Sequence, residues 1–312
     1  MGRAFISIFG VDNDDTCRQC KLGDNPPIVS RLRSALLDFA RAIVRVASGP
    51  AVFYRLCISP ASRCLPAYLR NVRGSRCYQN LTEADILETR KSDTVFIFGS
   101  GYSINEIGTE EWVRMGECDT ISLREFPRQS FVRADYHVSA EVDDMDEYAE
   151  RLRSNPLYSQ TIFVVQKGYS AISGNNLIGK RLLTEGRAVF RFKRRARGRC
   201  EPPSRSFSRG LVHGHGSLIG IVNFAYLMGW KKIVLVGIDM YDKRYFWLGP
   251  SEGRSYEKPS LTPSSSFPTA NPIIDCLGKW RTIFEKEAVS LFVYNPRSLL
   301  SRVLPVYRFP QV

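Results

Sequence analysis

Histidine is scarce in this chain, which has three, at positions 137, 213 and 215. Among the eight cysteines, Cys17 and Cys20 have a separation typical of zinc ligands, but no second pair completes a set of four. The tripeptide Asp239-Met240-Tyr241 lacks the paired carboxylates that hold a divalent ion beside a diphosphate. We therefore expect no resident metal ion and no cofactor.

Long apolar runs are missing as well. No stretch reaches the roughly 18 continuous apolar residues that a membrane-spanning helix needs. The N-terminus shows no charged region followed by a long apolar stretch, which is the pattern of a signal peptide. We expect a cytoplasmic protein with reduced thiols, either free or peripheral on the inner face of the cell membrane.

Acidic residues are too few to balance the basic ones, so the net charge is +13 and the pI is near 9.5. This balance favours an anionic partner: nucleic acid, an anionic membrane surface or a phosphate-bearing small substrate. A basic surface that only keeps the protein soluble is the further alternative. RNA binding would want aromatic side chains among the basic ones, and Phe190, Phe192 and Phe207 are too few and too separated. DNA is not among the partners that we expect.

Residues 1–92 read as a basic extension, with 14 Lys or Arg against 8 Asp or Glu. Within it, residues 31–47 predict an amphipathic helix, and residues 51–76 form a second apolar and basic stretch broken by prolines. Such an extension can lie on an anionic membrane surface. Alternatively it packs as a helical appendage on the main domain or on a neighbouring subunit, which would make the protein a homo-oligomer.

Residues 93–312 predict a second domain of the α/β class. Short apolar runs alternate with helical patterns, which indicates a Rossmann-like, mostly parallel sheet with helices on both faces. The expected strands are residues 94–98, 119–123, 136–139, 161–165, 188–192, 233–237 and 289–294.

The residues from 211 to 241 are organised as a single turn–helix–strand unit. A glycine-rich turn at 213–217 leads into an apolar helix at 218–228 and then into a β-branched strand at 233–237. Gly229 closes the helix, because its missing Cβ permits a left-handed cap.

Polar groups lie at both ends of this unit. Ser217 begins the helix, where unpaired N–H groups and the positive end of the dipole suit a phosphate. Asp239 and Tyr241 directly follow the strand, and ligands of open α/β sheets bind outside the carboxyl ends of strands. The unit therefore predicts an anion site and a strand-end polar pair.

A second glycine turn, Gly99-Ser100-Gly101-Tyr102-Ser103, follows the first strand of the domain and precedes a helical pattern. Glycines let backbone amides approach a phosphate or ribose closely. The alternative is a simple tight turn without a ligand.

Two loops interrupt the pattern. Residues 186–209 carry nine Lys or Arg against one Glu, together with Pro202-Pro203, and predict a mobile basic loop. It is either a lid that gathers a polyanionic substrate or a solvated run of charge. Residues 249–268 are rich in Ser, Pro and Gly, and long loops of this kind are commonly lids over active sites.

Four segments, in this order, resemble one family: residues 98–107, 215–241, 272–286 and 289–304. They are similar to the metal-independent bacterial sialyltransferases that extend lipooligosaccharide, and to the wider set of related Rossmann-like domains. That family has a strand followed by an NGPS-type turn, a Ser-Gly helix leading into a GIDFY strand end, and a CPNSLL-type close. The resemblance covers about residues 93–304.

The resemblance implies transfer of sialic acid from a CMP donor to a glycan acceptor, with inversion and without metal. Tyr241 and Tyr245 would hold the departing phosphate oxygen, and Arg124 stands where the family has a donor-binding asparagine. The donor nucleotide would lie against Gly99, Ser100, Gly101, Ser103, Arg124, Gly216, Ser217 and Asp239.

The chain also departs from the family. Ser100 replaces the asparagine of the NGPS turn, and no histidine follows His215, although the family's catalytic histidine lies after the GID strand. Pro268 or a close neighbour occupies that place. His213 and His215 are then the nearest imidazoles for a general base, with His137 a weaker candidate. Alternatively, His213 and His215 are turn residues bonded to backbone.

Three functions therefore stay open. The first is an inverting glycosyltransferase acting on a CMP-sugar, and the second is a nucleotide-binding or interaction module of the same fold without catalysis. The third, suggested by charge alone, is an RNA-associated protein. The tyrosines after Asp239 favour the first, and the missing histidine favours the second.

Overall fold

The computed structural model describes residues 59–139, 144–168, 171–195, 200–214, 216–241, 244–249 and 270–310. The predicted helix at 31–47 and the Cys17–Cys20 pair lie outside the described residues. The described segments belong to one compact unit, Ile58–Val312.

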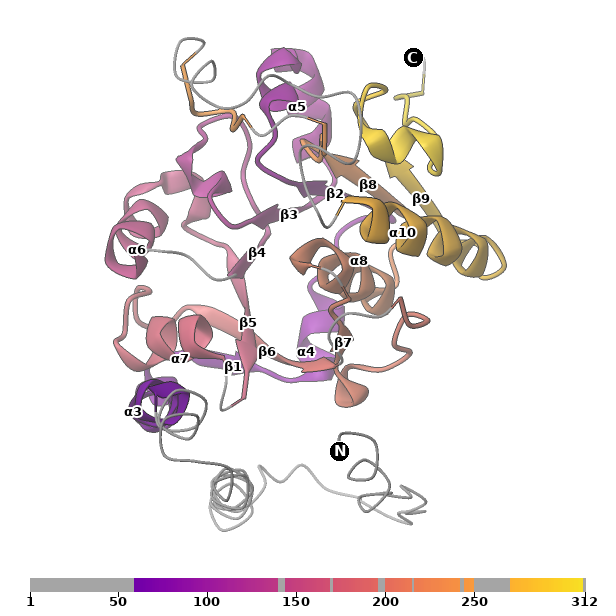
Figure 1. The fold of residues 1–312 in the computed structure, drawn as a ribbon. Helices are drawn as coiled ribbons and strands as arrows, with labels where there is room; N and C mark the ends of the chain where they lie inside the picture. The colour runs from indigo at the N-terminus through magenta and orange to yellow at the C-terminus, as the bar shows by residue number, and fades with distance from the viewer. Residues whose placement is uncertain are drawn as a thin grey trace, which may run out of the picture. The chain divides into compact units, whose positions relative to one another are not determined.

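In the described part of the chain, nine strands form one parallel sheet (Figure 1). Their order is β1-β6-β5-β4-β3-β2-β8-β9, and β7 pairs with the end of β6. The strands are β1 (Gln79–Leu81), β2 (Thr94–Phe98), β3 (Asp119–Leu123), β4 (Tyr136–Ser139), β5 (Ile162–Lys167), β6 (Ala188–Arg195), β7 (Leu211–Val212), β8 (Lys232–Val236) and β9 (Ser290–Val293). The predicted Rossmann-like α/β fold is confirmed.

Helices cover both faces of the sheet, as the alternation along β2 shows. Val95 and Ile97 pack in the cluster that contains α8 and α10, whereas Phe96 and Phe98 pack in the cluster of α5. The helices are α3 (Ser59–Gly74), α4 (Glu83–Glu88), α5 (Thr109–Gly116), α6 (Met145–Ser154), α7 (Ile172–Gly179), α8 (Ser217–Met228) and α10 (Ala270–Glu285). Short 3-10 turns are η3 (Ser75–Cys77), η4 (Tyr102–Glu106), η5 (Phe126–Arg128), η6 (Pro156–Tyr158), η7 (Phe207–Arg209) and η9 (Leu299–Arg302).

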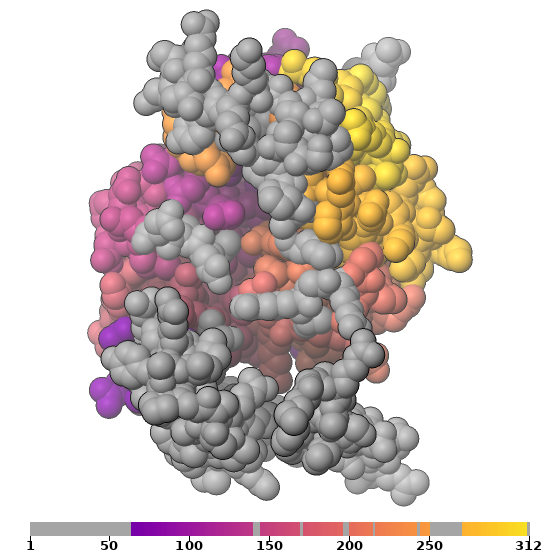
Figure 2. Space-filling model, viewed as in Figure 1, coloured from indigo at the N-terminus to yellow at the C-terminus, as the bar shows by residue number. Residues whose placement is uncertain are grey.

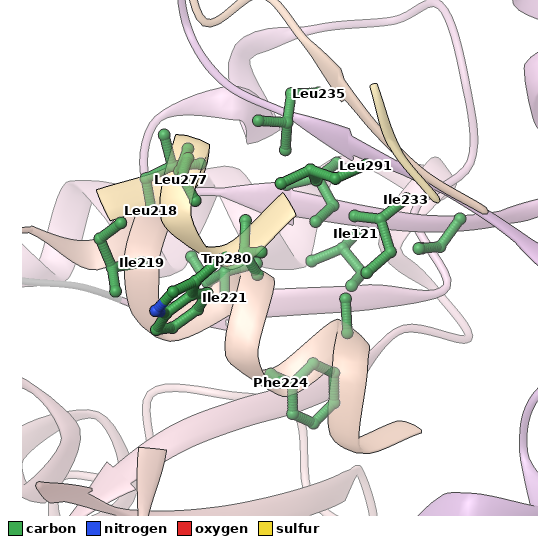
Figure 3. Packing of buried hydrophobic residues seen from close by; sticks show 14 of the residues in the cluster. Ile121, Leu218, Ile219, Ile221, Phe224, Ile233, Leu235, Leu277, Trp280 and Leu291 are labelled. Atoms are coloured by element: carbon green, nitrogen blue, oxygen red, sulfur yellow. The ribbon is translucent and has the colours of Figure 1, made fainter. Parts of the chain in front are cut away.

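Helix α8 is the most buried helix of the core. Its apolar residues extend around the whole helix, and Figure 3 shows Ile221 and Phe224 of α8 together with Trp280 of α10. Gly229 ends the helix with a φ of +83°, so the predicted left-handed cap is confirmed.

Residues 59–92 are part of the same unit as the sheet. Strand β1 pairs with β6, and α3 lies so close to α7 that a Cβ on Gly179 would be 2.7 Å from the backbone nitrogen of Asn71. The side chain of Asn71 also donates to Asn175 over 2.5 Å and accepts from Arg191 over 3.0 Å. The predicted domain boundary near Asp93 therefore falls inside this unit.

The prediction of an unpacked basic loop at residues 186–209 is wrong for its described residues. Strand β6 continues to Arg195, and both Ser204 and Phe207 are buried. The Asn223 side chain inside α8 accepts from the backbone nitrogens of Ser204 and Val212, over 3.1 and 2.9 Å. Asn223 thereby satisfies two buried backbone N–H groups. The charge composition of residues 186–209 gave no reason to expect this packing.

Candidate functional site

The order in which strands are added to the sheet reverses between β2 and β8. From β2 the chain adds β3, β4, β5 and β6 on one side and then returns through α8 to place β8 on the other side of β2. In open α/β sheets this reversal opens a crevice at the carboxyl ends of the strands, where ligands bind. Phe98 pairs with Val236 at this point, so the turn after β2 faces the turn after β8.

The two turns approach each other closely. The backbone nitrogens of Gly99 and Gly101 donate to the carbonyls of Val236 and Gly237, each over 2.8 Å. A Cβ on Gly101 would lie 2.7 Å from the Gly237 carbonyl and closer still to the Asp239 carboxylate. Glycine is therefore required here by the neighbouring strand end, whether or not a ligand is bound.

Asp239 is the buried centre of this junction. Its carboxylate accepts from the Ser103 backbone nitrogen over 3.0 Å, from the Ser103 hydroxyl over 2.5 Å and from the Asn295 amide over 2.9 Å. Charge-assisted hydrogen bonds of this kind offset the cost of burying a carboxylate. Ser103 and Asp239, both predicted to bind the donor, thus hold each other and fix the two turns.

The segment after β9 also donates hydrogen bonds to this junction. Besides the Asn295 bond, the Ser298 hydroxyl donates to the Ile238 carbonyl over 2.5 Å, and the Leu299 backbone nitrogen donates to the Asp239 carbonyl over 3.2 Å. Asn295 and Ser298 lie in the last segment that carries the family resemblance, but sequence reasoning assigned them no role. Their spacing in the NPRSLL string was the available signal.

Tyr241 is half-buried beside this junction. Its hydroxyl oxygen accepts from the Asn295 amide over 3.4 Å. Burial raises the pKa of Tyr241 above its ordinary value, and the charge of Asp239 raises it further. The phenol therefore keeps its proton at neutral pH and can donate to a phosphate oxygen.

The segment 244–249 lies over the glycine turn. Tyr245 forms a backbone bridge with Gly101, and the Phe246 backbone nitrogen donates to the Ser100 carbonyl over 3.2 Å. The exposed Tyr245 ring stacks on Trp247 with centroids 4.5 Å apart and planes 3° apart. The structure thus brings Tyr245 to the predicted nucleotide turn.

A basic side chain also lies at this turn. The Arg244 guanidinium is 4.1 Å from the ring centre of Tyr102, a cation–π contact. Neither Arg244 nor Tyr102 was predicted as a site residue, although Tyr102 lies in the predicted glycine turn and Arg244 directly precedes Tyr245.

The N-terminus of α8 lies at the same edge of the sheet, because β7 is parallel to β6 and α8 directly follows it. Gly216 precedes the helix, and no described side chain caps its first turn. A Cβ on Gly216 would be 3.6 Å from the end of the Ile273 side chain, so the first turn of α10 packs beside the start of α8.

The three histidines have different outcomes. His213 is half-buried; its carbonyl accepts from the Gly216 nitrogen over 3.1 Å, and its ring lies against Gly220 of α8. His215 lies outside the described residues. His137 is fully buried in β4 between the Ser122 hydroxyl, at 2.7 Å, and the Tyr148 hydroxyl. Burial lowers the pKa of His137 to about 3, which argues against it as the general base.

Arg124 follows β3 directly, at the strand edge next to the β2 turn. It is exposed and has a φ of +48°, an uncommon value for a residue with a side chain. Arg124 therefore lies one strand away from the crevice between β2 and β8.

Two negative findings concern the described residues alone. No three or more His, Cys, Asp or Glu side chains gather there as a metal-binding group. None of the described helices has both the length and the apolar content to cross a bilayer.

No protein-family model matches the chain, and no curated protein was found to match it.

Proposed function

We propose that this protein is a glycosyltransferase that transfers an anionic sugar from a CMP-sugar to a glycan acceptor, with inversion and without metal. The observation that carries the proposal is the junction at Asp239. Three segments that resemble the sialyltransferase family, far apart in sequence, converge on this one carboxylate through Ser103 and Asn295. They do so at the chain reversal, where a nucleotide-binding α/β fold binds its ligand.

The donor would lie along the strand ends. The positive end of α8 at Ser217 suits the phosphate of the nucleotide. The exposed face of the stacked Tyr245 and Trp247 rings suits the cytosine base.

The chemistry would be a single displacement. The acceptor hydroxyl attacks the anomeric carbon, the bond from that carbon to the phosphate oxygen breaks, and CMP leaves with the electron pair. Tyr241 donates a hydrogen bond to the departing phosphate. The acceptor proton goes to His213 or His215, the two imidazoles nearest to the helix N-terminus.

A nucleotide-binding module without catalysis is the second candidate. It is favoured by the absence of any histidine after His215 in the sequence. It shares the crevice and differs only in the lack of turnover.

Release of CMP from CMP-sialic acid, with EDTA present, separates the two candidates. Steady release that rises when glycan acceptors are added supports the transferase. Binding of CMP without release, over a panel of acceptors, supports the module. Release that requires a divalent ion contradicts the metal-independent mechanism.

A further inference from the structure

Helix α3 has a buried face and an exposed apolar face. The buried face includes Cys64, Ala67 and Asn71, and Asn71 lies against Gly179 and Asn175 of α7. The other carries Leu65, Leu69 and Val72, whose exposed fractions are 39%, 51% and 42%. The spacing of these three residues, four and then three positions apart, puts them on one side of the helix.

The grouping of these residues is unusual for this molecule. Eight large apolar side chains of the described residues are exposed, and three of them share this one helix face. The others are single residues spread over different elements: Leu87, Val113, Phe131, Ile172 and Tyr245. Apolar residues exposed singly are ordinary, but a group on one helix face marks a surface that contacts something apolar.

The surroundings of this face are basic. Arg73 is exposed beside it and Arg76 is exposed in η3 directly after the helix, whereas Arg70 lies on the α7 side and donates to Asn176 over 3.2 Å. Residues 59–82 contain no Asp or Glu. Atoms of α3 are visible at the surface in indigo in Figure 2. An apolar helix face bordered by arginines has the chemistry of a helix that lies in the interface of an anionic bilayer.

We propose that the face formed by Leu65, Leu69 and Val72 docks on an anionic lipid surface. Charge complementarity favours lipid over two other occupants of this face, residues 31–57 of the same chain and a second copy of the protein. Residues 31–57 of the chain carry five Arg against one Asp, and a second copy would present the same arginines, so like charges would meet in both cases. The inference is independent of the nucleotide site.

The first test is sedimentation of the full chain with phosphatidylcholine vesicles, with and without phosphatidylglycerol. We expect binding that requires phosphatidylglycerol, and a reduction of about tenfold or more in the double variant Leu65→Gln, Leu69→Gln. Both leucines are exposed, so the variant should unfold at the same urea concentration as the native chain. The control Val113→Gln changes a residue of α5 that is 60% exposed and should bind vesicles normally.

Three results would overturn the proposal: no vesicle binding, binding indifferent to phosphatidylglycerol, or a double variant that binds like the native chain. Hydrogen exchange adds a second readout, since vesicles should protect the backbone of residues 59–77. Protection confined to residues 31–57 would assign the lipid contact to that segment instead. CMP binding should be equal in all these variants, so failure here is distinguishable from failure of the nucleotide site.

Discussion

The Ser103 hydroxyl donates to the Asp239 carboxylate over 2.5 Å, although the two residues are 136 positions apart in the chain. This bond joins the turn after β2 to the end of β8. The order of strand addition in the sheet reverses between these two strands. The donors around Asp239 therefore determine the shape of the proposed nucleotide crevice.

Ser103→Ala should lower the free energy of unfolding by about 1.5–3 kcal/mol, because a buried carboxylate loses one of its donors. Urea unfolding measures this loss. Ser208→Ala is the matched control, since Ser208 is exposed and its hydroxyl bonds only to Ser206 among the hydrogen bonds described for it. The control should stay within about 0.5 kcal/mol of the native chain. Equal stability of the two variants would show that the Asp239 junction is not held as described.

Gly101→Ala should destabilise the protein by about 1–3 kcal/mol and abolish CMP binding, because the new methyl group would overlap Gly237 and Asp239. Gly108→Ala is the control. A Cβ there would meet only a Glu111 oxygen, at 3.5 Å, so stability and binding should be nearly unchanged. Normal CMP binding by Gly101→Ala would contradict the proposed position of the crevice.

Stability should fall in mild acid because of His137. Burial keeps its imidazole neutral in the folded protein, with a pKa of about 3, whereas the unfolded chain takes up this proton below about pH 6.5. Uptake by the unfolded state alone lowers the free energy of unfolding as the pH falls from 6.5 toward 3, by about 1.4 kcal/mol per pH unit.

His137→Phe removes this titration. The variant should be less stable at pH 7, because Ser122 and Tyr148 lose a partner, but its stability should fall less steeply with acid. Urea unfolding at a series of pH values between 7 and 4.5 measures the two slopes. Parallel slopes would contradict a buried, neutral His137.

Most of the sheet could be predicted from the sequence, because its central strands are short runs of buried apolar residues. Strands β2, β3 and β4 have the predicted bounds, and β5, β6, β8 and β9 differ at their ends. Strand β1 was missed because Gln79 and Asn80 are exposed and show no apolar alternation. Strand β7 has two residues, which is too short for any periodic pattern.

The site was predictable only in part. Glycine and serine at a strand end indicate a turn near a ligand, but hydrogen-bond partners distant in sequence cannot be read from local spacing. Asn295 therefore received no role, and Ser103 was expected to face the ligand rather than Asp239. The segment 200–209 was misjudged because its charge and prolines outweighed the one informative residue, a polar Asn223 inside an apolar helix.

Tyr241→Phe should lower the rate of CMP release from CMP-sialic acid by about 10²-fold, because the departing phosphate loses a donor. The dissociation constant of CMP should change little. Tyr307→Phe is a matched control: Tyr307 is another half-buried tyrosine, packed on Phe96 at 5.5 Å between ring centres. Unchanged release by Tyr241→Phe would remove this tyrosine from the proposed mechanism.

The central claim is a metal-independent CMP site at the junction of β2, β8 and α8. Calorimetric titration of CMP, UDP and GDP, each with and without magnesium, tests it most directly, with Ser217→Trp as the blocked variant. We predict binding of CMP alone, unaffected by magnesium and lost in Ser217→Trp. Binding of UDP or GDP only with magnesium, or no nucleotide binding at all, would contradict the account.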